Sequence, residues 1–188
     1  MLKEPLNNRN LIIAKTHELL IIHGFKATSV KLVAQAAGVA PGLIHYYFKN
    51  KEELIVAVLD EAKQHCLRDW DEILQHAKET RTSGNILDLV KKRILTDLEV
   101  YRLRFELYSI GLNNSNLKVH VNALLLEEQQ KIAELITLLA RKEGLNHDAL
   151  AASLTAAFDG LALRKLTDED FDLNAAYETL TDMYLSFI

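Results

Sequence analysis

The stretch from Gly24 to Leu54 reads GFKATSVKLVAQAAGVAPGLIHYYFKNKEEL and decides the fold expected for the start of this chain. Thr28 and Ser29 carry side-chain oxygens that can cap a helix, and this helix is expected to end just before Gly38, a residue that tolerates positive φ in a turn. Pro41 suits the first position of a third, short helix, because its missing N–H costs nothing there. With the helix that precedes Gly24, this arrangement predicts a helix-turn-helix.

The segments on either side continue the helical pattern. A first helix is expected over residues 8–23, with Ile22 facing inward and Gly24 as its left-handed stop. Asn50 and Glu53 have the spacing of a capping box, which predicts a fourth helix that runs to about residue 79.

Apolar residues recur at helical spacing along the rest of the chain, without convincing period-two alternation. The polar segment 80–85 predicts a linker, and residues 111–116 a loop. Helices are expected over residues 86–98 and 99–112 (one helix or two is left open), 117–143, 146–166, and from 172 to the end. The predicted fold is all-α, with a three-helix helix-turn-helix domain at residues 1–51 and a helical domain at 52–188, connected by the helix at 52–79.

Charge is distributed unevenly along the chain. The net charge of −4 by itself argues weakly against binding to nucleic acid. Residues 1–51, however, hold seven Lys and Arg against two Glu, a formal charge of +5, and the remainder is at −9. A basic end joined to an acidic body is typical of a protein that contacts DNA at one end, although solvated faces also produce such a split.

A helix-turn-helix places the N-terminal side chains of its third helix in the major groove while neighbouring groups hold phosphates. Here Pro41, Gly42 and Leu43 are small or apolar, so this helix can approach the base edges closely. Lys51 stands beside a helix N-terminus, where backbone N–H groups favour an anion. The aromatic residues His45, Tyr46 and Tyr47 can donate hydrogen bonds to phosphates or stack on sugars.

Three segments, Gly24–Val30, Ala34–Val39 and His45–Leu54, resemble the DNA-binding signature of the TetR family of bacterial regulators. The likeness covers roughly residues 9–58, and its glycine, aromatic and capping positions are all in register. The resemblance implies a three-helix DNA-binding domain, a fourth helix leading into an all-α ligand-binding and dimerisation domain, and a repressor that a small molecule releases from DNA.

Carried over by position, the family's phosphate contacts fall on Thr28, His45, Tyr46, Tyr47 and Lys51, with Ser29 in the same interface, and its base-reading positions on Lys31, Pro41, Gly42 and Leu43. Tyr47 could equally be a packing residue. Two positions depart from the family pattern. Ala40 replaces the usual serine cap of the recognition helix, which removes about 1 kcal/mol, and His45 replaces a usual tyrosine, so its phosphate contact would depend on pH. Direct readout is expected from Lys31 to guanine, supplemented by thymine methyl contacts and DNA shape.

The C-terminal helices carry the features expected of a dimer interface. Ala152, Ala156 and Gly160 recur every four residues and form a flat strip that a second helix can approach closely. In the last helix, Leu180, Tyr184 and Phe187 form an apolar seam. The stretch from residue 158 to 173 resembles the last two helices of some TetR-family regulators, in which these helices pair with their copies in a second subunit. The alternative is that the strip packs within one subunit.

The sequence indicates the ligand-binding residues less clearly than the DNA-binding residues. An effector cavity is predicted between the helices, with candidate lining residues Trp70, Tyr101, Arg104, Phe105, Tyr108, Asn122 and Phe158. Aromatic residues at helical spacing also belong to ordinary cores, and a buried Arg104 would indicate an anionic ligand.

No arrangement of nucleophile and base, and no phosphate loop, predicts an enzyme, and neither a cofactor nor a metal is expected. Glu61, His65, Glu72 and His76 share one side of a helix, but a solvated face explains them better than a metal site, since helical metal sites draw ligands from several helices. A single cysteine and the lack of a signal peptide or membrane span favour the cytoplasm. The predicted function is a homodimeric, ligand-responsive repressor of a palindromic operator. The alternative is a helical carrier or adaptor without DNA binding.

Overall fold

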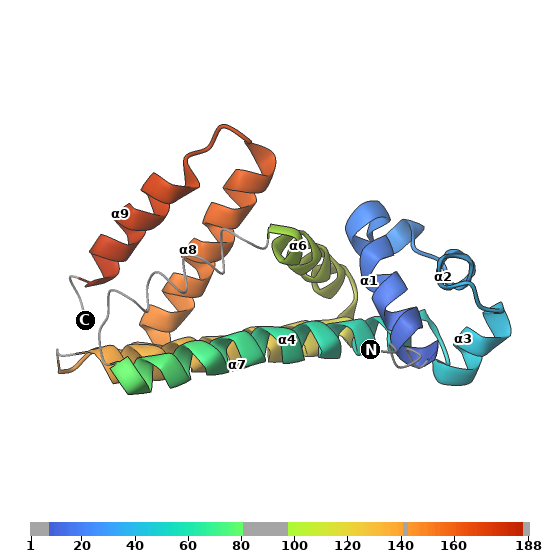
Figure 1. The fold of residues 1–188 in the computed structure, drawn as a ribbon, viewed down its shortest axis with the longest axis horizontal. Helices are drawn as coiled ribbons and strands as arrows, with labels where there is room; N and C mark the ends of the chain where they lie inside the picture. The colour runs from blue at the N-terminus through green and yellow to red at the C-terminus, as the bar shows by residue number, and fades with distance from the viewer. Residues whose placement is uncertain (1–7, 81–97, 141–142, 186–188) are drawn as a thin grey trace, which may run out of the picture. The chain divides into compact units, whose positions relative to one another are not determined.

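The computed structural model describes residues 8–80, 98–140 and 143–185, and all regular structure within these ranges is α-helical (Figure 1). In chain order and with the labels of Figure 1, the helices are α1 (Asn8–Ala27), α2 (Val30–Ala37), α3 (Pro41–Tyr47), α4 (Lys51–Thr80), α6 (Leu98–Asn113), α7 (Ser115–Leu139), α8 (His147–Thr167) and α9 (Leu173–Leu185). The predicted all-α class is confirmed. Among the helices of these described ranges, none has the length and apolar character needed to cross a membrane.

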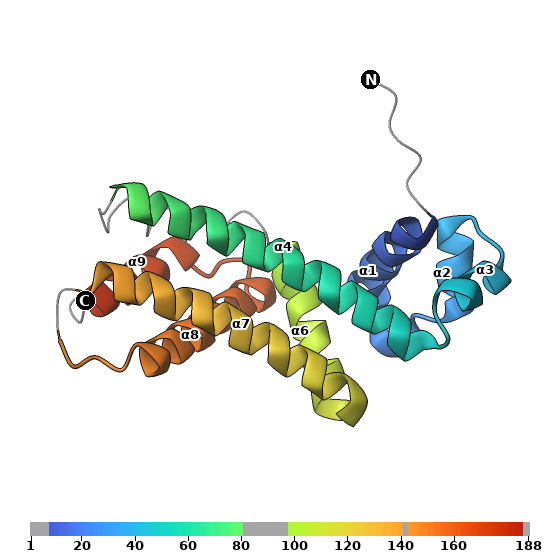
Figure 2. The same cartoon turned by 90° about the horizontal axis from the view of Figure 1, so that it is seen from below.

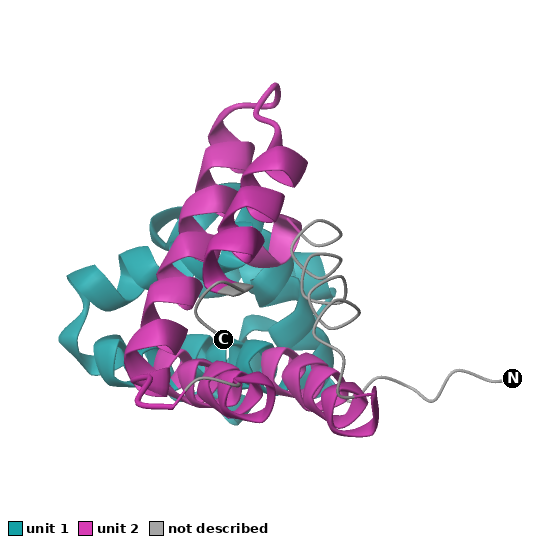
Figure 3. Cartoon of the chain, turned by 90° about the vertical axis from the view of Figure 1, so that its left-hand side faces the viewer, with its two compact units in different colours: residues 1–64, 102–123 teal, residues 65–101, 124–188 magenta. Residues whose placement is uncertain are grey.

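The chain divides into two compact units (Figure 3). Unit 1 comprises residues 1–64 and 102–123, and unit 2 comprises residues 65–101 and 124–188. The helix-turn-helix therefore shares its unit with most of α6 and the first part of α7. The domain boundary predicted at residues 51 and 52 stays a prediction, as does the linker, because residues 81–97 lie outside the described ranges. For the same reason, only residues 98–112 of the region 86–112 are described, and they belong to α6.

Unit 1 is built on the cluster of α1, α2 and α3 (Figure 2). One face of each helix supplies large apolar side chains to a common core, and the start of α4 closes it. The core side chains include Ile12, Leu20, Val33, Ile44, Phe48 and Leu54, each no more than 2% exposed. Burial of such residues stabilises a small domain by roughly 1.5–3 kcal/mol per side chain. The recognition helix α3 is therefore held firmly although it has only seven residues.

The end of α1 differs from the prediction. Gly24 has the expected positive φ, 72°, but its ψ of 172° lies outside the left-handed helical region, and α1 continues past this kink to Ala27. Ile22 was expected to face inward, and this prediction is wrong, because its side chain is 69% exposed. The kink directly follows this turn of α1, and the core contacts of the helix end at Leu19 and Leu20.

The loop predicted at residues 111–116 is also wrong, because α6 extends to Asn113 and α7 begins at Ser115. Two local contacts explain the tight connection. The side chain of Asn114 accepts hydrogen bonds from the backbone N–H groups of Asn116 (2.9 Å) and Leu117 (3.3 Å), which caps α7. Gly111 lies against Val121, close enough that a Cβ there would come within 3.0 Å of the Val121 side chain.

In unit 2, the second part of α4 runs beside α7, as Figures 1 and 2 show. The two helices are joined at three levels, by Trp70 with Glu128, Asp71 with Lys131 and Lys78 with Glu134. Helix α7 ends at Leu139, earlier than the predicted residue 143.

Helices α8 and α9 form a second pair in unit 2 (Figure 1). The rings of Phe158 and Tyr177 stack between them with centroids 5.9 Å apart. The predicted caps of both helices are confirmed, since Asn146 Oδ1 accepts from the Ala149 N–H (3.0 Å) and Asp172 Oδ1 accepts from the Ala175 N–H (3.0 Å).

Candidate nucleic-acid interface

The turn between α2 and α3 has the geometry that the sequence predicts for a helix-turn-helix. The Ser29 hydroxyl accepts a 3.1 Å hydrogen bond from the Leu32 N–H and caps α2. Gly38 takes the left-handed conformation, with φ 66° and ψ 30°, and its N–H bonds the last carbonyls of the helix. Pro41 then opens α3, while Ala40 precedes it in an extended conformation without a side-chain cap. The missing cap inferred from Ala40 is thus confirmed.

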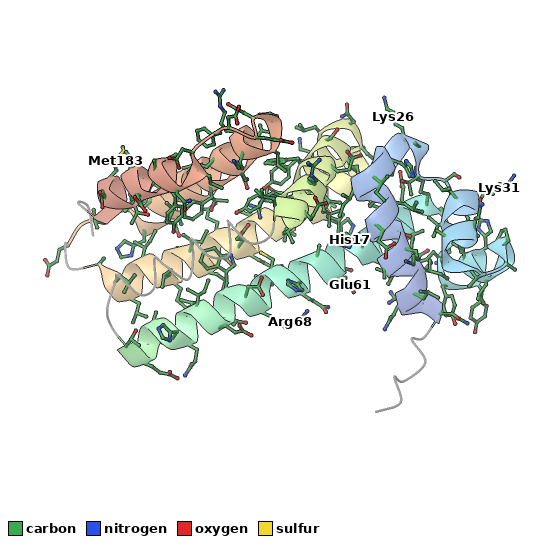
Figure 4. All side chains as sticks on the ribbon, turned by 45° about the horizontal axis from the view of Figure 1, so that its top comes forward. His17, Lys26, Lys31, Glu61, Arg68 and Met183 are labelled. Atoms are coloured by element: carbon green, nitrogen blue, oxygen red, sulfur yellow. The ribbon has the colours of Figure 1, made fainter. Side chains whose placement is uncertain are left out.

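Most side chains predicted to face DNA are exposed on α2 and α3. Lys31, which Figure 4 shows pointing away from α2, is exposed, and so are Pro41, Gly42, His45 and Tyr46. Tyr46 is 78% exposed, unusual for an aromatic ring with no core role. Leu43 and Tyr47 are half-buried.

Tyr47 packs between its neighbours in the sequence. Its ring makes an edge contact with the ring of Tyr46 at 5.0 Å and a tilted contact with the buried Phe48 at 6.4 Å. This ring therefore supports the orientation of Tyr46 and joins it to the core, in line with the packing alternative for Tyr47.

Thr28 lies inside the domain. Its side chain is 2% exposed, and its hydroxyl donates to the carbonyl oxygens of Gly24 (2.8 Å) and Leu19 (3.2 Å) at the end of α1. A phosphate contact from this hydroxyl would require it to leave both carbonyls. In its observed position, Thr28 fixes the end of α1. This role could not be inferred from the sequence, where Thr28 directly precedes the residue that caps α2.

The start of α4 is capped as predicted. Asn50 Oδ1 accepts a 2.8 Å hydrogen bond from the Glu53 N–H, and the Glu53 carboxylate accepts a 2.7 Å bond from the Lys49 N–H. The half-buried Lys51 extends its ammonium group to the carbonyl oxygen of Phe25 and over the Phe25 ring, 3.9 Å from the centroid. Partial burial lowers the pKa of Lys51 from its ordinary value, because desolvation disfavours its charge.

Two residues near this surface were missed by the sequence analysis. The guanidinium of Arg9 lies 5.4 Å from the centroid of the Phe48 ring, which holds an exposed cation near the end of α3. The carboxylate of Glu106, on α6, accepts a 2.5 Å hydrogen bond from the Phe25 N–H. A contact across 81 residues leaves no local signal in the sequence.

Residues 12–58 match the sequence profile of the family described as bacterial regulatory proteins, tetR family. The match covers α1 from Ile12 onward, all of α2 and α3, and the start of α4, the part that carries the geometry above. The resemblance to the TetR family inferred from the sequence is thereby confirmed over residues 12–58.

Similarity to known proteins extends over nearly the whole chain. The fatty acid metabolism regulator protein of Bacillus subtilis is 27% identical over 192 residues, which cover 94% of this chain and 93% of the relative. The crystal structure of the transcriptional regulator FadR from Bacillus subtilis in complex with stearoyl-CoA is similar in fold, with a TM-score of 0.75, 24% identity and coverage of 95% and 98% of the two chains. A TetR transcription regulator from Haloarcula marismortui gives a TM-score of 0.78 at 17% identity, over 96% of this chain and 97% of the other. These relatives are regulators, and the prediction that this chain is not an enzyme is confirmed by them.

The residues predicted to bind a ligand fall in both units. Arg104, Phe105, Tyr108 and Asn122 belong to unit 1, and Trp70, Tyr101 and Phe158 belong to unit 2. Trp70, Tyr101, Arg104 and Phe158 are buried, Phe105 and Tyr108 are half-buried, and Asn122 is exposed. The Arg104 guanidinium, with the residue 8% exposed, lies 5.4 Å from the centroid of the Tyr108 ring, whose edge meets the Phe105 ring at 6.1 Å.

The residues predicted for dimerisation lie on α8 and α9. Ala152, Ala156 and Gly160 are all exposed along one face of α8. Leu180 and Tyr184 are half-buried, and Tyr184 makes a side-chain hydrogen bond with Ser153 of α8, so part of the seam also packs within the subunit. Phe187 lies outside the described residues. Met183, 57% exposed, points outward from α9 (Figure 4).

The acidic and histidine residues of α4 were predicted to form a solvated face. Glu61, His65 and Glu72 are exposed, whereas His76 is half-buried. His65 Nδ1 lies 3.4 Å from the carboxylate of Asp69, one turn further along. Within the part of the chain that the structure describes, no three His, Cys, Asp or Glu side chains are grouped as a metal site would need.

Proposed function

We propose that this TetR-family regulator is a repressor that binds a palindromic DNA operator as a homodimer and responds to a small-molecule ligand. The observation that carries the proposal is the exposed set of Lys31, His45 and Tyr46 on a capped helix-turn-helix with a basic N-terminal segment. A lysine on α2 and donors on α3 suit a duplex, since phosphates take most contacts and few side chains read bases. Because a regulator of this kind acts on DNA, we propose that it works in the cytoplasm.

The proposed homodimer has the two-fold symmetry that the proposed palindromic operator requires. Helix-turn-helix dimers place two recognition helices one DNA turn apart on a pseudo-palindrome. The small side chains of Ala152, Ala156 and Gly160 remain exposed in the single chain, although they are the kind of surface against which a second helix packs closely. We propose that this face of α8 pairs with its copy.

The proposed effector is a long-chain acyl-CoA. The support is the likeness over most of the chain to the fatty acid metabolism regulator, and the related fold of the Bacillus subtilis FadR that was solved with stearoyl-CoA. The buried Arg104 adds a physical reason, because a cation held in a low-dielectric environment favours a ligand with anionic groups. Ligand binding is proposed to tilt α4, which would change the separation of the two recognition helices. An equal separation of these helices in free and ligand-bound dimers would contradict this mechanism.

A selection of bound genomic fragments tests DNA binding directly. The wild type is compared with a Lys31→Ala, Tyr46→Ala variant, whose altered side chains are exposed and outside the core, and with Lys118→Ala, which removes an exposed cation from α7. We expect one short palindrome to be enriched by the wild type and by Lys118→Ala and lost by the double variant. Binding to that site should weaken steeply with salt. If no fragment is enriched and salt has no effect, the chain is a ligand carrier without DNA binding.

The effector is tested on the selected operator. Stearoyl-CoA is expected to release the wild type from DNA, whereas CoA alone and stearate alone are the controls for the two halves of the molecule. Release by Arg104→Met at the same concentration as the wild type would argue against a role for this cation in ligand binding.

A further inference from the structure

The peptide unit around Phe25 is held from two sides within unit 1. On one side, Glu106 Oε1 of α6 accepts a 2.5 Å hydrogen bond from the Phe25 N–H. On the other, the ammonium of Lys51, the first residue of α4, donates to the Phe25 carbonyl oxygen and lies 3.9 Å from the centroid of its ring. Three helices, α1, α4 and α6, therefore meet at one residue.

The kink at Gly24 makes this arrangement possible. A φ of 72° with a ψ of 172° is a conformation essentially restricted to glycine. It turns the next N–H out of the hydrogen-bond ladder of α1, so this donor needs an acceptor from another part of the chain. A Cβ at position 24 would lie 3.2 Å from Glu106 Oε1, so glycine also leaves room for the carboxylate.

The contact with Phe25 orients the Lys51 ammonium without using all of it. An ammonium has three N–H donors, and the Phe25 carbonyl takes one of them. The ring of Phe25 fixes the position of the charge by a cation–π contact. Lys51 follows directly after the capping residue of α4, so its remaining donors lie at a helix N-terminus, where an anion such as a DNA phosphate is favoured.

We propose that Glu106 is a positioning residue for DNA binding, which acts through Phe25 to hold the Lys51 ammonium in place for a phosphate. This inference rests on the proposed function and adds a regulatory route to it. A displacement of α6 that withdraws the Glu106 carboxylate releases the Phe25 peptide and with it the lysine. The position of α6 is thereby coupled to a phosphate contact without any change in the recognition helix itself.

Two substitutions at position 106 separate the hydrogen bond from the charge. Glu106→Gln and Glu106→Ala remove the same negative charge, but only glutamine keeps an oxygen that accepts from the Phe25 N–H. We expect Glu106→Ala to bind the selected operator about five- to tenfold more weakly than Glu106→Gln, the effect of losing one well-placed hydrogen bond. Amide hydrogen exchange at Phe25, an independent readout, should be faster in Glu106→Ala than in Glu106→Gln.

A double-mutant cycle with Lys51→Met tests the route. If Glu106 acts through the lysine, the difference between Ala and Gln at position 106 should disappear in the Lys51→Met background. In Lys51→Met, the slope of the logarithm of the DNA-binding constant against the logarithm of the salt concentration should decrease in magnitude by about one, as expected for one lost phosphate contact. Equal affinities of the two Glu106 variants, or a difference that persists undiminished in Lys51→Met, would overturn the inference. Failure of the wild type to bind any operator would instead overturn the proposed function, while the Phe25 exchange rates would still report on the hydrogen bond.

Discussion

The indole Nε1 of Trp70 donates a 3.0 Å hydrogen bond to Glu128 Oε1, and both residues are almost completely buried, with exposed fractions of 1% and 3%. This pair joins α4 to α7 in the interior of unit 2. The salt bridge between Asp71 and Lys131 joins the same helices one residue further along α4, but its side chains are 60% and 30% exposed. The two contacts have similar positions and opposite environments, so they should contribute very differently to stability.

We expect Glu128→Ala to lower the free energy of unfolding by about 2–3 kcal/mol, because it strips a buried indole donor of an acceptor. Glu128→Gln, which keeps an acceptor oxygen, should cost less. Lys131→Ala, the matched control, should cost less than about 1 kcal/mol, as exposed ion pairs do. Urea unfolding followed by far-UV circular dichroism and by the fluorescence of Trp70, the only tryptophan of the chain, measures all three. Equal losses for the buried and the exposed substitution would show that burial does not govern this interface.

The two turn glycines of unit 1 should differ in their tolerance of asparagine. Gly38 lies in the left-handed helical region, where asparagine is accepted, and a Cβ there meets nothing within 4 Å. Gly24 lies in a glycine-only region and faces Glu106. We expect Gly38→Asn to cost less than about 1 kcal/mol and Gly24→Asn about 2 kcal/mol or more, measured as unfolding free energies. A larger loss at position 38 than at 24 would contradict the assigned conformations.

The carboxylate of Glu52 accepts hydrogen bonds from the side-chain amides of Asn114 (2.7 Å) and Asn116 (3.2 Å), and these bonds lower its pKa from the ordinary value of 4.5. A carboxyl whose pKa is lowered by folding stabilises the native state above its unfolded pKa, and this contribution is lost as the pH falls through the lower folded pKa.

The Asn114→Ala, Asn116→Ala variant should therefore have a raised Glu52 pKa in a carbon-13 NMR titration. The stability difference from wild type should be largest near neutral pH and should shrink as the solution is acidified below pH 4.5. Because Asn114 also caps α7, Glu52→Gln serves as the comparison that leaves this cap intact. An unchanged Glu52 titration in the asparagine variant would show that these amides do not control it.

A charge placed on the exposed strip of α8 should prevent assembly and leave the subunit folded. Ala156 is exposed in the single chain, so Ala156→Glu removes no core contact, but it would bury an unpaired carboxylate in a homodimer. We expect the wild type to sediment as a dimer and Ala156→Glu as a monomer with an unchanged helix content. Gln130→Glu, which adds a charge to an exposed position on α7, is the control. A dimer that persists in Ala156→Glu would place the interface elsewhere.

The sequence by itself determined the elements whose signals act over a few residues. Ser29, Gly38, Asn50 and Glu53 were read correctly because helix caps and left-handed turns depend on the conformation of four or five neighbouring residues. The helix-turn-helix, and with it most of the exposed candidate interface, follows from these local rules. The spacing of apolar residues likewise indicates an all-α fold, since it reports the period of the backbone.

Only the tertiary structure decided which partner each helix face meets. Periodicity marks a helix face but not its neighbour, so Ile22 was placed inside although the buried residues of α1 end before it. Thr28 was assigned a phosphate contact by resemblance, although its hydroxyl donates to a carbonyl at the end of α1. The bonds of Glu106 to Phe25 and of Trp70 to Glu128 span 81 and 58 residues. A contact of that range depends on how helices pack in three dimensions, and nothing in the neighbouring residues of the chain encodes it.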